Sequence, residues 1–359
     1  MVNTCAIREN AEKKIWNKLN SLYGVEKKKR PDIKIGVLGC MAERVKDKML
    51  EHRVVDLVAG PDAYRDLPRL LSLLDSDQSE GAMNVQLSQD ETYADILPVR
   101  RNKDALNAWI SIMRGCNNMC SFCIVPFVRG RERNRAATSI VDEVRYLRDE
   151  GVKEITLLGQ NVNSYHDKAH EYKPADSDVA KSMHVNSAGF SEMFKLRGGD
   201  GARFADLMDM VSEAAPEIRF RFTSPHPKDF PDTILNVIAE KANVCKQVHM
   251  PAQSGNTDML FRMRRNHTRE SYLELVEHVR ATIPGVALST DMICGFCDET
   301  DAEFEDTMTI LELVKYDLAF LFAYSMRERT HAHRRMQDNV PEDVKKARLV
   351  RMIDVFKLR

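Results

Sequence analysis

The sequence predicts an α/β protein with a small amino-terminal α/β domain and a larger domain of six strand–helix units. Within residues 1–100, two short apolar runs alternate with helix-like segments. From about residue 108, six further apolar runs alternate with helical stretches, which is typical of parallel βα units. The length of 359 residues, 43% of them hydrophobic, suits about two domains with buried cores.

In the first domain, residues 34–39 and 54–59 are apolar and predict two buried strands. Residues 44–52 predict a helix between them, and residues 62–74 predict a second helix that ends in a polar loop. We expect the first domain to span 1–100, the second to span 101–340, and an extension to begin at 341, with a helix starting near Pro341.

The second domain follows with strand-length apolar runs at 109–113, 155–158, 220–223, 247–250, 287–293 and 318–324. Residues 139–150 predict a helix that Ser139 caps and Gly151 ends, and residues 268–281 predict another. The carboxyl ends of such parallel strands are expected to carry the site. Residues 166–202 lack an apolar period and predict an inserted loop that a Gly/Ser linker could replace.

Charge and hydropathy limit the function classes. The net charge is −1, from 53 basic and 54 acidic residues, so any RNA site must come from local clustering. Three clusters could contact phosphate or could be solvated surface: Arg129, Arg131, Arg133 and Arg135; Arg262, Arg264, Arg265 and His267; Arg327, Arg329, His331, His333, Arg334 and Arg335. No run approaches the ~20 apolar residues of a membrane span, and the amino terminus lacks a signal-peptide pattern.

The strongest chemical signal is a cysteine motif directly after the strand predicted at 109–113. Cys116, Cys120 and Cys123 have the spacing C-x3-C-x2-C. Three thiolates on one loop can hold three irons of a [4Fe–4S] cluster and leave the fourth iron open for another ligand. Zinc is the alternative, but zinc loops favour paired C-x2-C units with a fourth ligand elsewhere. The remaining alternative is that the three cysteines are unrelated.

This motif resembles the radical S-adenosylmethionine (SAM) superfamily. The wider pattern resembles the tRNA methylthiotransferases, which make 2-methylthio-N6-isopentenyladenosine. The resemblance covers nearly the whole chain apart from the insert. The insert and residues 294–298 are most similar to the animal mitochondrial branch. Its segments are 3–8, 39–44, 116–133, 157–165, 251–255 and 289–291.

The resemblance implies a radical SAM partial (βα)6 barrel after the amino-terminal methylthiotransferase domain. It implies an auxiliary [4Fe–4S] cluster with Cys5 and Cys40 as two of its three ligands. Taken alone, either residue could be a small buried thiol. The resemblance also implies that SAM is bound by residues that follow two strands or lie in a third: Gly159, Gln160, Asn161, Gln253, Ser254, Ile293 and Gly295.

A methylthio group added at adenine C2 explains the need for a radical, because that C–H bond is not acidic. No Ser/His/Asp set suggests polar catalysis, and no acid–base residue is assigned. The resemblance implies modification at position 37 of the tRNA anticodon loop, an electron donor, a mitochondrial location and a kinase regulatory subunit as partner. It implies that the chain lacks an upstream cluster cysteine and the carboxyl-terminal RNA-binding TRAM domain.

Two rival functions remain open. A sister enzyme could act on another modified adenosine or on a ribosomal protein, because the cluster motifs are shared. A truncated, non-catalytic protein could instead bind and regulate a partner. The other three cysteines, Cys245, Cys294 and Cys297, are expected to be structural, although Cys294 and Cys297 form a C-x2-C pair.

Overall fold

The computed structural model describes the chain except residues 8, 76–80, 91–92, 94–95, 97–98, 101, 170–200 and 359. Two compact units form, each from separate stretches of sequence. Unit 1 consists of Met1–Thr92, Gly115–Glu132 and Arg327–Arg334. Unit 2 consists of Tyr93–Arg114, Arg133–Met326 and Arg335–Arg359.

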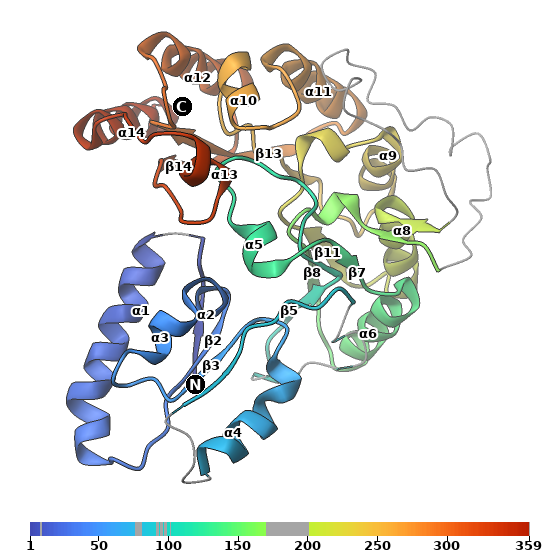
Figure 1. Ribbon diagram of the computed structural model, residues 1–359. Helices are drawn as coiled ribbons and strands as arrows, with labels where there is room; N and C mark the ends of the chain where they lie inside the picture. Colours follow the sequence, from blue (N-terminus) through green and yellow to red (C-terminus); the bar gives the residue numbers. More distant parts are fainter. Residues whose placement is uncertain are drawn as a thin grey trace. The chain divides into compact units, whose positions relative to one another are not determined.

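Unit 1 contains a four-stranded, fully parallel sheet (Figure 1). The strand order is β1 (Val2–Thr4), β2 (Gly36–Gly39), β3 (Leu57–Ala59), β4 (Ala82–Asn84). Both predicted strands are therefore present. Helices cover both faces, since Val58 packs in one core cluster with Leu19 while its neighbour Leu57 packs in another with Leu70. The helices are α1 (Glu9–Leu22), η1 (Tyr23–Lys27), α2 (Cys40–Val45), α3 (Asp47–Leu50), η2 (Tyr64–Asp66) and α4 (Leu67–Asp75).

The single helix predicted over residues 44–52 is wrong. The backbone breaks at Lys46, whose φ of +50° lies outside the helical region, so that α2 and α3 are separate. α2 begins at Cys40, directly after β2. Strands β1 and β4 were not predicted because their sequences, VNT and AMN, form no apolar run, whereas the equally short β3 lies within the apolar run of 54–59.

Unit 2 contains all six predicted strands. They form two three-stranded parallel sheets, in the orders β11-β8-β5 and β12-β13-β14. A parallel bridge between Phe220 and Val244 links the two, which gives the expected partial (βα)6 barrel. The strands are β5 (Asn107–Ser111), β8 (Glu154–Leu158), β11 (Arg219–Phe222), β12 (Gln247–His249), β13 (Ala287–Cys294) and β14 (Leu318–Ala323).

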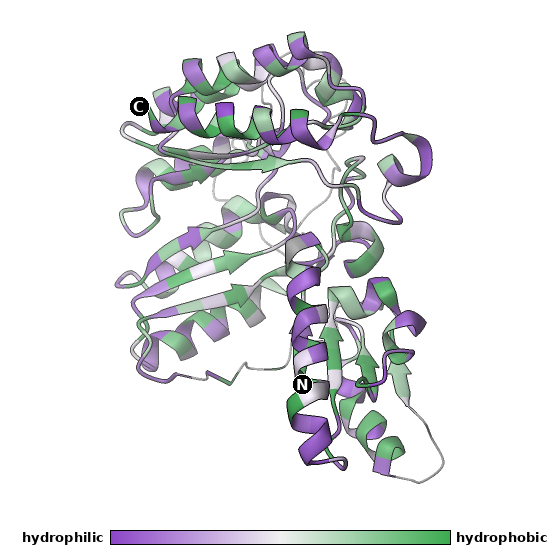
Figure 2. Ribbon diagram, turned by 90° about the vertical axis from the view of Figure 1, so that its left-hand side faces the viewer, coloured by the Kyte–Doolittle hydropathy of each residue, from purple (hydrophilic) through white to green (hydrophobic). Residues whose placement is uncertain are grey.

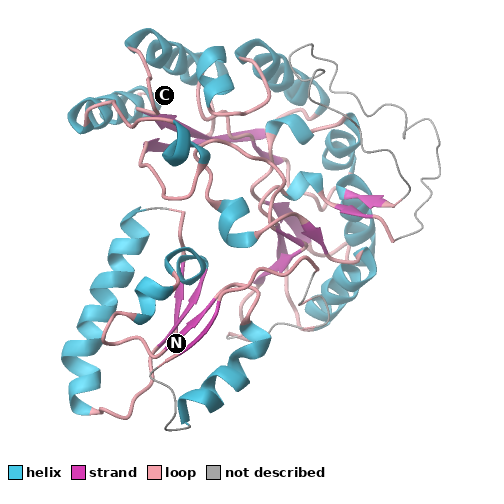
Figure 3. Ribbon diagram, viewed as in Figure 1, coloured by secondary structure: helices cyan, strands magenta, loops and turns pink. Residues whose placement is uncertain are grey.

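Helices lie outside these strands and bury one face of each (Figure 3). On β13, Leu288 and Met292 are at most 1% exposed and belong to the core beneath the helices. The helices of unit 2 are α6 (Ala137–Asp149), α8 (Phe204–Ala214), α9 (Asp232–Glu240), α10 (Thr257–Arg262), α11 (Arg269–Thr282), α12 (Asp301–Val314) and α14 (Glu342–Lys357). Shorter helical segments are α5 (Val125–Arg129), η3 (Val162–Ser164), η5 (Pro227–Asp229) and α13 (His331–Arg335).

Ser139 does not cap α6, contrary to prediction. The helix starts two residues earlier, and no side chain caps it. Instead, the Ser139 hydroxyl accepts a hydrogen bond from Arg135 Nη2 at 2.9 Å. Gly151 does follow the last turn, with a φ of +81° that suits glycine. The predicted helix over 268–281 appears as α11, which Thr268 and Ser271 cap reciprocally.

The predicted insert over 166–202 is more ordered at its ends than expected. β9 (His166–Asp167) and β10 (Ala202–Arg203) pair antiparallel. Asp167 also accepts a buried hydrogen bond from the backbone N–H of Ala137 at 2.8 Å. The remainder of the predicted loop, residues 170–200, lies outside the described residues.

Hydropathy follows this layering. Green apolar and purple polar residues alternate along the helices, and the strands carry green residues together with white or purple ones (Figure 2). Within the described part of the chain, no helix has both the length and the apolar character required to cross a membrane.

Candidate functional site

The three-cysteine loop runs between two short strands, β6 (Met113–Arg114) and β7 (Arg133–Asn134), which pair antiparallel with each other. Cys116 and Cys120 are each 8% exposed, and Cys123 is half-buried. The loop starts at Gly115, whose φ is +74°. A Cβ there would lie 2.1 Å from the carbonyl oxygen of Arg131, so only glycine fits.

Backbone hydrogen bonds hold this loop in shape. The N–H of Cys116 donates to the Gly130 carbonyl at 3.2 Å, and that of Cys123 donates to the Cys120 carbonyl at 3.0 Å. The N–H of Asn118 points at the Cys116 sulfur, 3.4 Å away. Ser121 is fully buried, and its backbone carbonyl accepts a hydrogen bond from the N–H of Ala332 at 2.8 Å. The loop is thus preorganised by the chain itself.

Cys5 and Cys40 follow paired positions of neighbouring parallel strands, since Thr4 on β1 pairs with Gly39 on β2. They therefore lie at the same edge of the sheet of unit 1. Arg129, at the end of α5, donates from Nε to the Cys40 sulfur at 2.9 Å. Burial raises the pKa of the Cys40 thiol, and the Arg129 guanidinium opposes this by favouring the thiolate.

Both cysteine sets belong to unit 1, although the sequence assigned them to different domains. Helix α5, directly after the three-cysteine loop, contributes Val128 to a core cluster that also contains Ala6 and Cys40. The side chain of Arg129 comes from the same helix. A common packing cluster therefore connects the loop of 116–123 with the edge that carries Cys5 and Cys40.

The donor chemistry fits an iron–sulfur cluster. The loop offers three thiols, two of them shielded from water, and no disulfide joins any of the eight cysteines. Among the described residues, no group of three or more His, Cys, Asp or Glu is close enough to hold one metal ion. In a four-iron cluster each thiolate binds a different iron, so its cysteines lie farther apart than the ligands of one ion.

The first predicted SAM segment, 159–161, follows β8 directly. Gly159 is tightly packed, because a Cβ would lie 2.6 Å from Met113 Cγ. Asn161 is 3% exposed, and its side-chain amide donates to Asp229 Oδ2 at 2.9 Å. That amide therefore positions the loop after β8, and only its oxygen has no protein partner.

The other two predicted segments lie side by side. Gln253 bridges in parallel to Met292, and the N–H of Ile293 donates to the Gln253 carbonyl at 2.9 Å. Ser254 is 1% exposed and shares a hydrogen bond with Thr307 at 3.2 Å. The N–H of Gly295 donates to Glu299. Hence the polar groups of Ser254 and Gly295 are engaged within the protein.

Strained backbone marks the carboxyl ends of the strands. Of the eight described non-glycine residues with positive φ, three follow barrel strands: Ser224, Gln253 and Asp298, with φ values of +60°, +70° and +61°. They follow β11, β12 and β13, and Gln253 itself belongs to a predicted SAM segment. Such conformations cost free energy and concentrate at functional sites, so this edge is the candidate substrate-binding edge of unit 2.

Sequence reasoning missed a polar group on the face of the barrel strands that lies opposite the helices. His249 Nδ1 lies 2.9 Å from Ser289 Oγ, and His249 Nε2 lies 3.5 Å from Asp291 Oδ2. The phenyl ring of Phe320 meets the His249 ring edge-on, with 6.1 Å between centroids. The alternation of side chains along a strand is a signal that could have identified this face. Val248 and Met292, which are next to His249 and Asp291 in the sequence, are fully buried on the opposite face.

Several residues of the predicted phosphate-binding clusters are buried. Arg133 and Arg135 are 5% and 7% exposed, and Arg135 pairs with the buried Glu143 at 2.6 Å. Arg265 and Arg327 are likewise buried, as is His267. These side chains cannot be surface phosphate contacts. The exposed cluster members are Arg131, Arg264, His333, Arg334 and Arg335.

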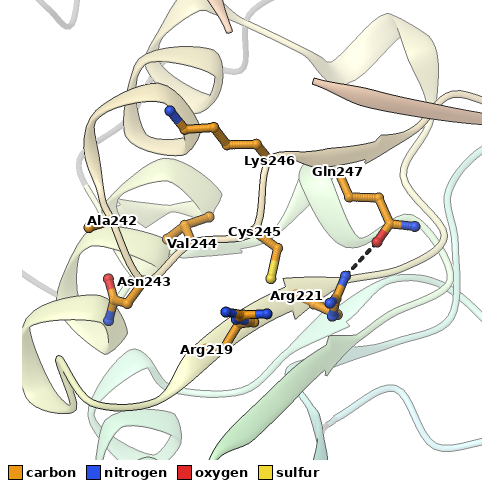
Figure 4. A pocket seen from close by; sticks show the side chains of 8 residues that line it. All are labelled: Arg219, Arg221, Ala242, Asn243, Val244, Cys245, Lys246 and Gln247. Carbon is orange, nitrogen blue, oxygen red and sulfur yellow. Dashed lines mark hydrogen bonds between the residues drawn. The ribbon is translucent and has the colours of Figure 1, made fainter. Parts of the chain in front are cut away.

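The remaining three cysteines lie outside both predicted cluster sets. Cys294 and Cys297 are fully buried, and burial raises the pKa of both thiols, that of Cys294 to about 12. Cys245 lines a pocket of about 350 Å³ at the amino ends of β11 and β12 (Figure 4). There Arg221 donates to Gln247 at 2.5 Å and pairs with Glu154 at 3.1 Å. This pocket is at the opposite strand ends from the predicted SAM segments.

Known proteins resemble the chain in both sequence and fold. Residues 110–311 match the Radical SAM superfamily, and residues 1–60 match the uncharacterized protein family UPF0004. The solved structure of the radical SAM methyltransferase TsrM from Kitasatospora setae superposes with a TM-score of 0.62 at 15% identity, over 93% of this chain and 64% of that one. The fold is thus that of radical SAM enzymes.

Sequence relatives define the family. The chain is 49% identical to the tRNA-2-methylthio-N(6)-dimethylallyladenosine synthase of Chloroherpeton thalassium, over 98% of this chain and 70% of that protein. It is 55% identical to the mitochondrial tRNA methylthiotransferase CDK5RAP1 of Mus musculus, over 99% of this chain and 60% of that protein. The chain therefore belongs to the radical SAM superfamily and, within it, to the tRNA-2-methylthio-N6-dimethylallyladenosine synthases. It spans only 60% of the length of the mouse relative.

Proposed function

We propose that this protein is a radical SAM enzyme that converts N6-isopentenyladenosine at position 37 of tRNA to its 2-methylthio derivative. The observation that carries this proposal is the 49% identity to a bacterial synthase over 70% of that protein's length. The preorganised three-cysteine loop supports it independently. Isopentenyl and dimethylallyl are two names for the same prenyl group.

Cys116, Cys120 and Cys123 would hold the [4Fe–4S] cluster of the radical SAM site. With SAM bound, that cluster supplies a 5′-deoxyadenosyl radical able to remove the inert C2 hydrogen of adenine. The chain keeps water from two of the thiols and fixes the loop through its backbone bonds. SAM would be bound by the segments 159–161, 253–254 and 293–295. The side-chain amide of Asn161 would position the loop after β8 and not contact SAM, because it donates to Asp229.

Cys5 and Cys40 would contribute to an auxiliary [4Fe–4S] cluster that provides sulfur. Their placement after paired residues of β1 and β2 supports this role. The Arg129 guanidinium would favour the thiolate of Cys40, which is the form that binds iron. An external electron donor and a mitochondrial location are part of the proposal, the latter because the mouse relative carries that description.

The rival functions predict different measurements. A sister methylthiotransferase would cleave SAM but leave prenylated tRNA unchanged. A non-catalytic regulator that binds a kinase regulatory subunit would bind little iron and would not cleave SAM. Nucleoside mass spectrometry after incubation with SAM, a reductant and prenylated tRNA distinguishes these cases from the proposed function.

Replacing Cys116, Cys120 and Cys123 together by Ala should remove the radical SAM cluster and abolish SAM cleavage. Each thiolate lost exposes one iron to exchange, so iron and sulfide content should fall by roughly one cluster per chain. Iron analysis and quantification of 5′-deoxyadenosine give the readout. Cys245→Ala, which changes a thiol outside the loop, is the control and should retain both. Wild-type SAM cleavage by the triple variant would contradict the assignment.

A further inference from the structure

The strands β12, β13 and β14 of unit 2 have one face packed against helices, while the described residues cover the opposite face less completely. Val248, Leu288 and Met292 lie on the covered face and are at most 1% exposed. Residues of the opposite face alternate with them. That face carries Phe320 and Leu318, each 43% exposed, on β14. Part of the Phe320 ring contacts His249 edge-on, and the exposed part is available to stack against a ligand.

Polar groups surround this ring in a fixed register. His249 is paired with Ser289 across β12 and β13, and Asp291 is paired with Phe320 across β13 and β14. The side chains of His249 and Asp291 are 19% and 32% exposed. Ser289 Oγ and Asp291 Oδ2 flank the imidazole at its two nitrogens. The imidazole orientation is thus fixed, and the carboxylate of Asp291 remains accessible as a hydrogen-bond acceptor.

We infer that His249, Asp291 and Phe320 form the binding site for the target purine, with the base stacked on Phe320 and its N6–H donating to Asp291. This inference rests on the proposed function and names the residues that would select its base. Single-stranded RNA bases are commonly held by aromatic stacking and by hydrogen bonds to their Watson–Crick edge. Here an exposed ring and an anionic acceptor are neighbours on adjacent strands.

The position of these residues also suits the chemistry. Ile293, in a segment proposed to bind SAM, follows Asp291 by two residues on the same strand and therefore shares its face. Two residues along a strand correspond to about 7 Å. A base held at Asp291 would therefore lie next to SAM, as hydrogen abstraction from C2 requires. An N6-prenylated adenine keeps one N6–H, so it can still donate to a carboxylate.

Binding of anticodon stem-loops to the anaerobically purified protein tests the stacking. Phe320→Ala should weaken binding about tenfold for RNA with adenine at position 37, and Phe320→Trp should not, because a base–aromatic stack is worth roughly this factor. The loss should vanish for RNA that is abasic at position 37. Leu318→Ala, on the same strand and face with equal exposure but two residues nearer the amino end, should bind both RNAs like wild type.

A change in the base tests the hydrogen bond. Wild-type protein should bind RNA with N6,N6-dimethyladenine, which has no N6–H, more weakly than RNA with N6-isopentenyladenine. Asp291→Ala should remove this preference. If Phe320→Ala weakens binding of adenine and abasic RNA equally, or if Asp291→Ala keeps the preference for N6-isopentenyladenine, the purine site is wrong. Either result would leave the proposed function standing. If wild-type protein binds no anticodon stem-loop, the proposed function fails together with it.

Discussion

Two buried histidines stand out at the scale of single residues. His226 and His267 are each 5% exposed and meet edge-on, with 6.2 Å between ring centroids. Burial lowers the pKa of His226 well below 6.5, with Arg265 and Lys228 adding to the effect, and lowers that of His267 to about 3. Both rings are therefore neutral in the folded protein and help to build the loops behind the strand ends.

Stability should fall as the pH drops below about 6.5. A histidine whose pKa is lowered by folding takes up its proton mainly in the unfolded state, so acid favours unfolding. Each of the two would contribute at most about 1.4 kcal/mol per pH unit in the window between 6.5 and its folded pKa. Urea unfolding at pH 7.5 and pH 5.5 measures this.

Variants identify the source of this pH dependence. His267→Gln should reduce the difference in free energy of unfolding between the two pH values. The control is His278→Gln, which changes a more exposed histidine that pairs with Asp232. The free energy of unfolding of this variant should differ more between the two pH values than that of His267→Gln. Equal pH dependence in wild type and His267→Gln would rule out the buried imidazole as its cause.

At the scale of elements, the first turn decides where several helices begin. In α12, the Thr300 side chain accepts from the N–H of Glu303 while the Glu303 carboxylate accepts from the N–H of Thr300. In α6, by contrast, no side chain caps the start, and the predicted Ser139 cap instead bonds Arg135. Capping residues can be recognised in sequence only when no stronger partner competes for the same hydroxyl.

Thr300→Ala should destabilise the protein by about 1 kcal/mol, because α12 loses a hydrogen bond to its amino-terminal N–H groups. Thr282→Ala removes the same atoms from an exposed site in the last turn of α11, where the hydroxyl donates to the His278 carbonyl. Its effect should be smaller. Denaturant midpoints of both variants give the comparison, and equal losses would argue against the cap.

At the scale of the whole molecule, replacing the insert over 166–202 in two lengths shows which of its residues contribute to stability. Asp167 and Ala202 are antiparallel partners, so a short Gly/Ser linker can join the chain between them. Replacing 170–200 should change the melting temperature little. Replacing all of 166–202 also removes β9 and the Asp167 bond to Ala137, which leaves a buried N–H unsatisfied.

That larger replacement should lower the melting temperature by several degrees, since an unsatisfied buried group costs about 1–3 kcal/mol. Thermal denaturation of the two variants beside wild type measures the difference. A large drop already for the 170–200 replacement would show that this segment contributes to the folded structure. No drop for either would show that the β9–β10 pair contributes little.

The sequence by itself determined what is local. The six barrel strands, the helix over 268–281 and the C-x3-C-x2-C loop each depend on neighbouring residues, because periodicity and ligand spacing act over a dozen positions or fewer. The position of the three-cysteine loop at the end of a strand was therefore predictable. The strands β1 and β4 could not be predicted, since their sequences, VNT and AMN, form no apolar run and only pairing with β2 and β3 defines them.

Only the tertiary structure decided how polar groups are used. Asn161 meets Asp229 across 68 residues, and Arg129 meets Cys40 across 89. Such partners cannot be read from spacing, because chain separation says nothing about which side chains a fold brings together. For the same reason the group of His249, Asp291 and Phe320 became visible only once β12, β13 and β14 were placed side by side. Each strand supplies one member, and the register of the sheet supplies the site.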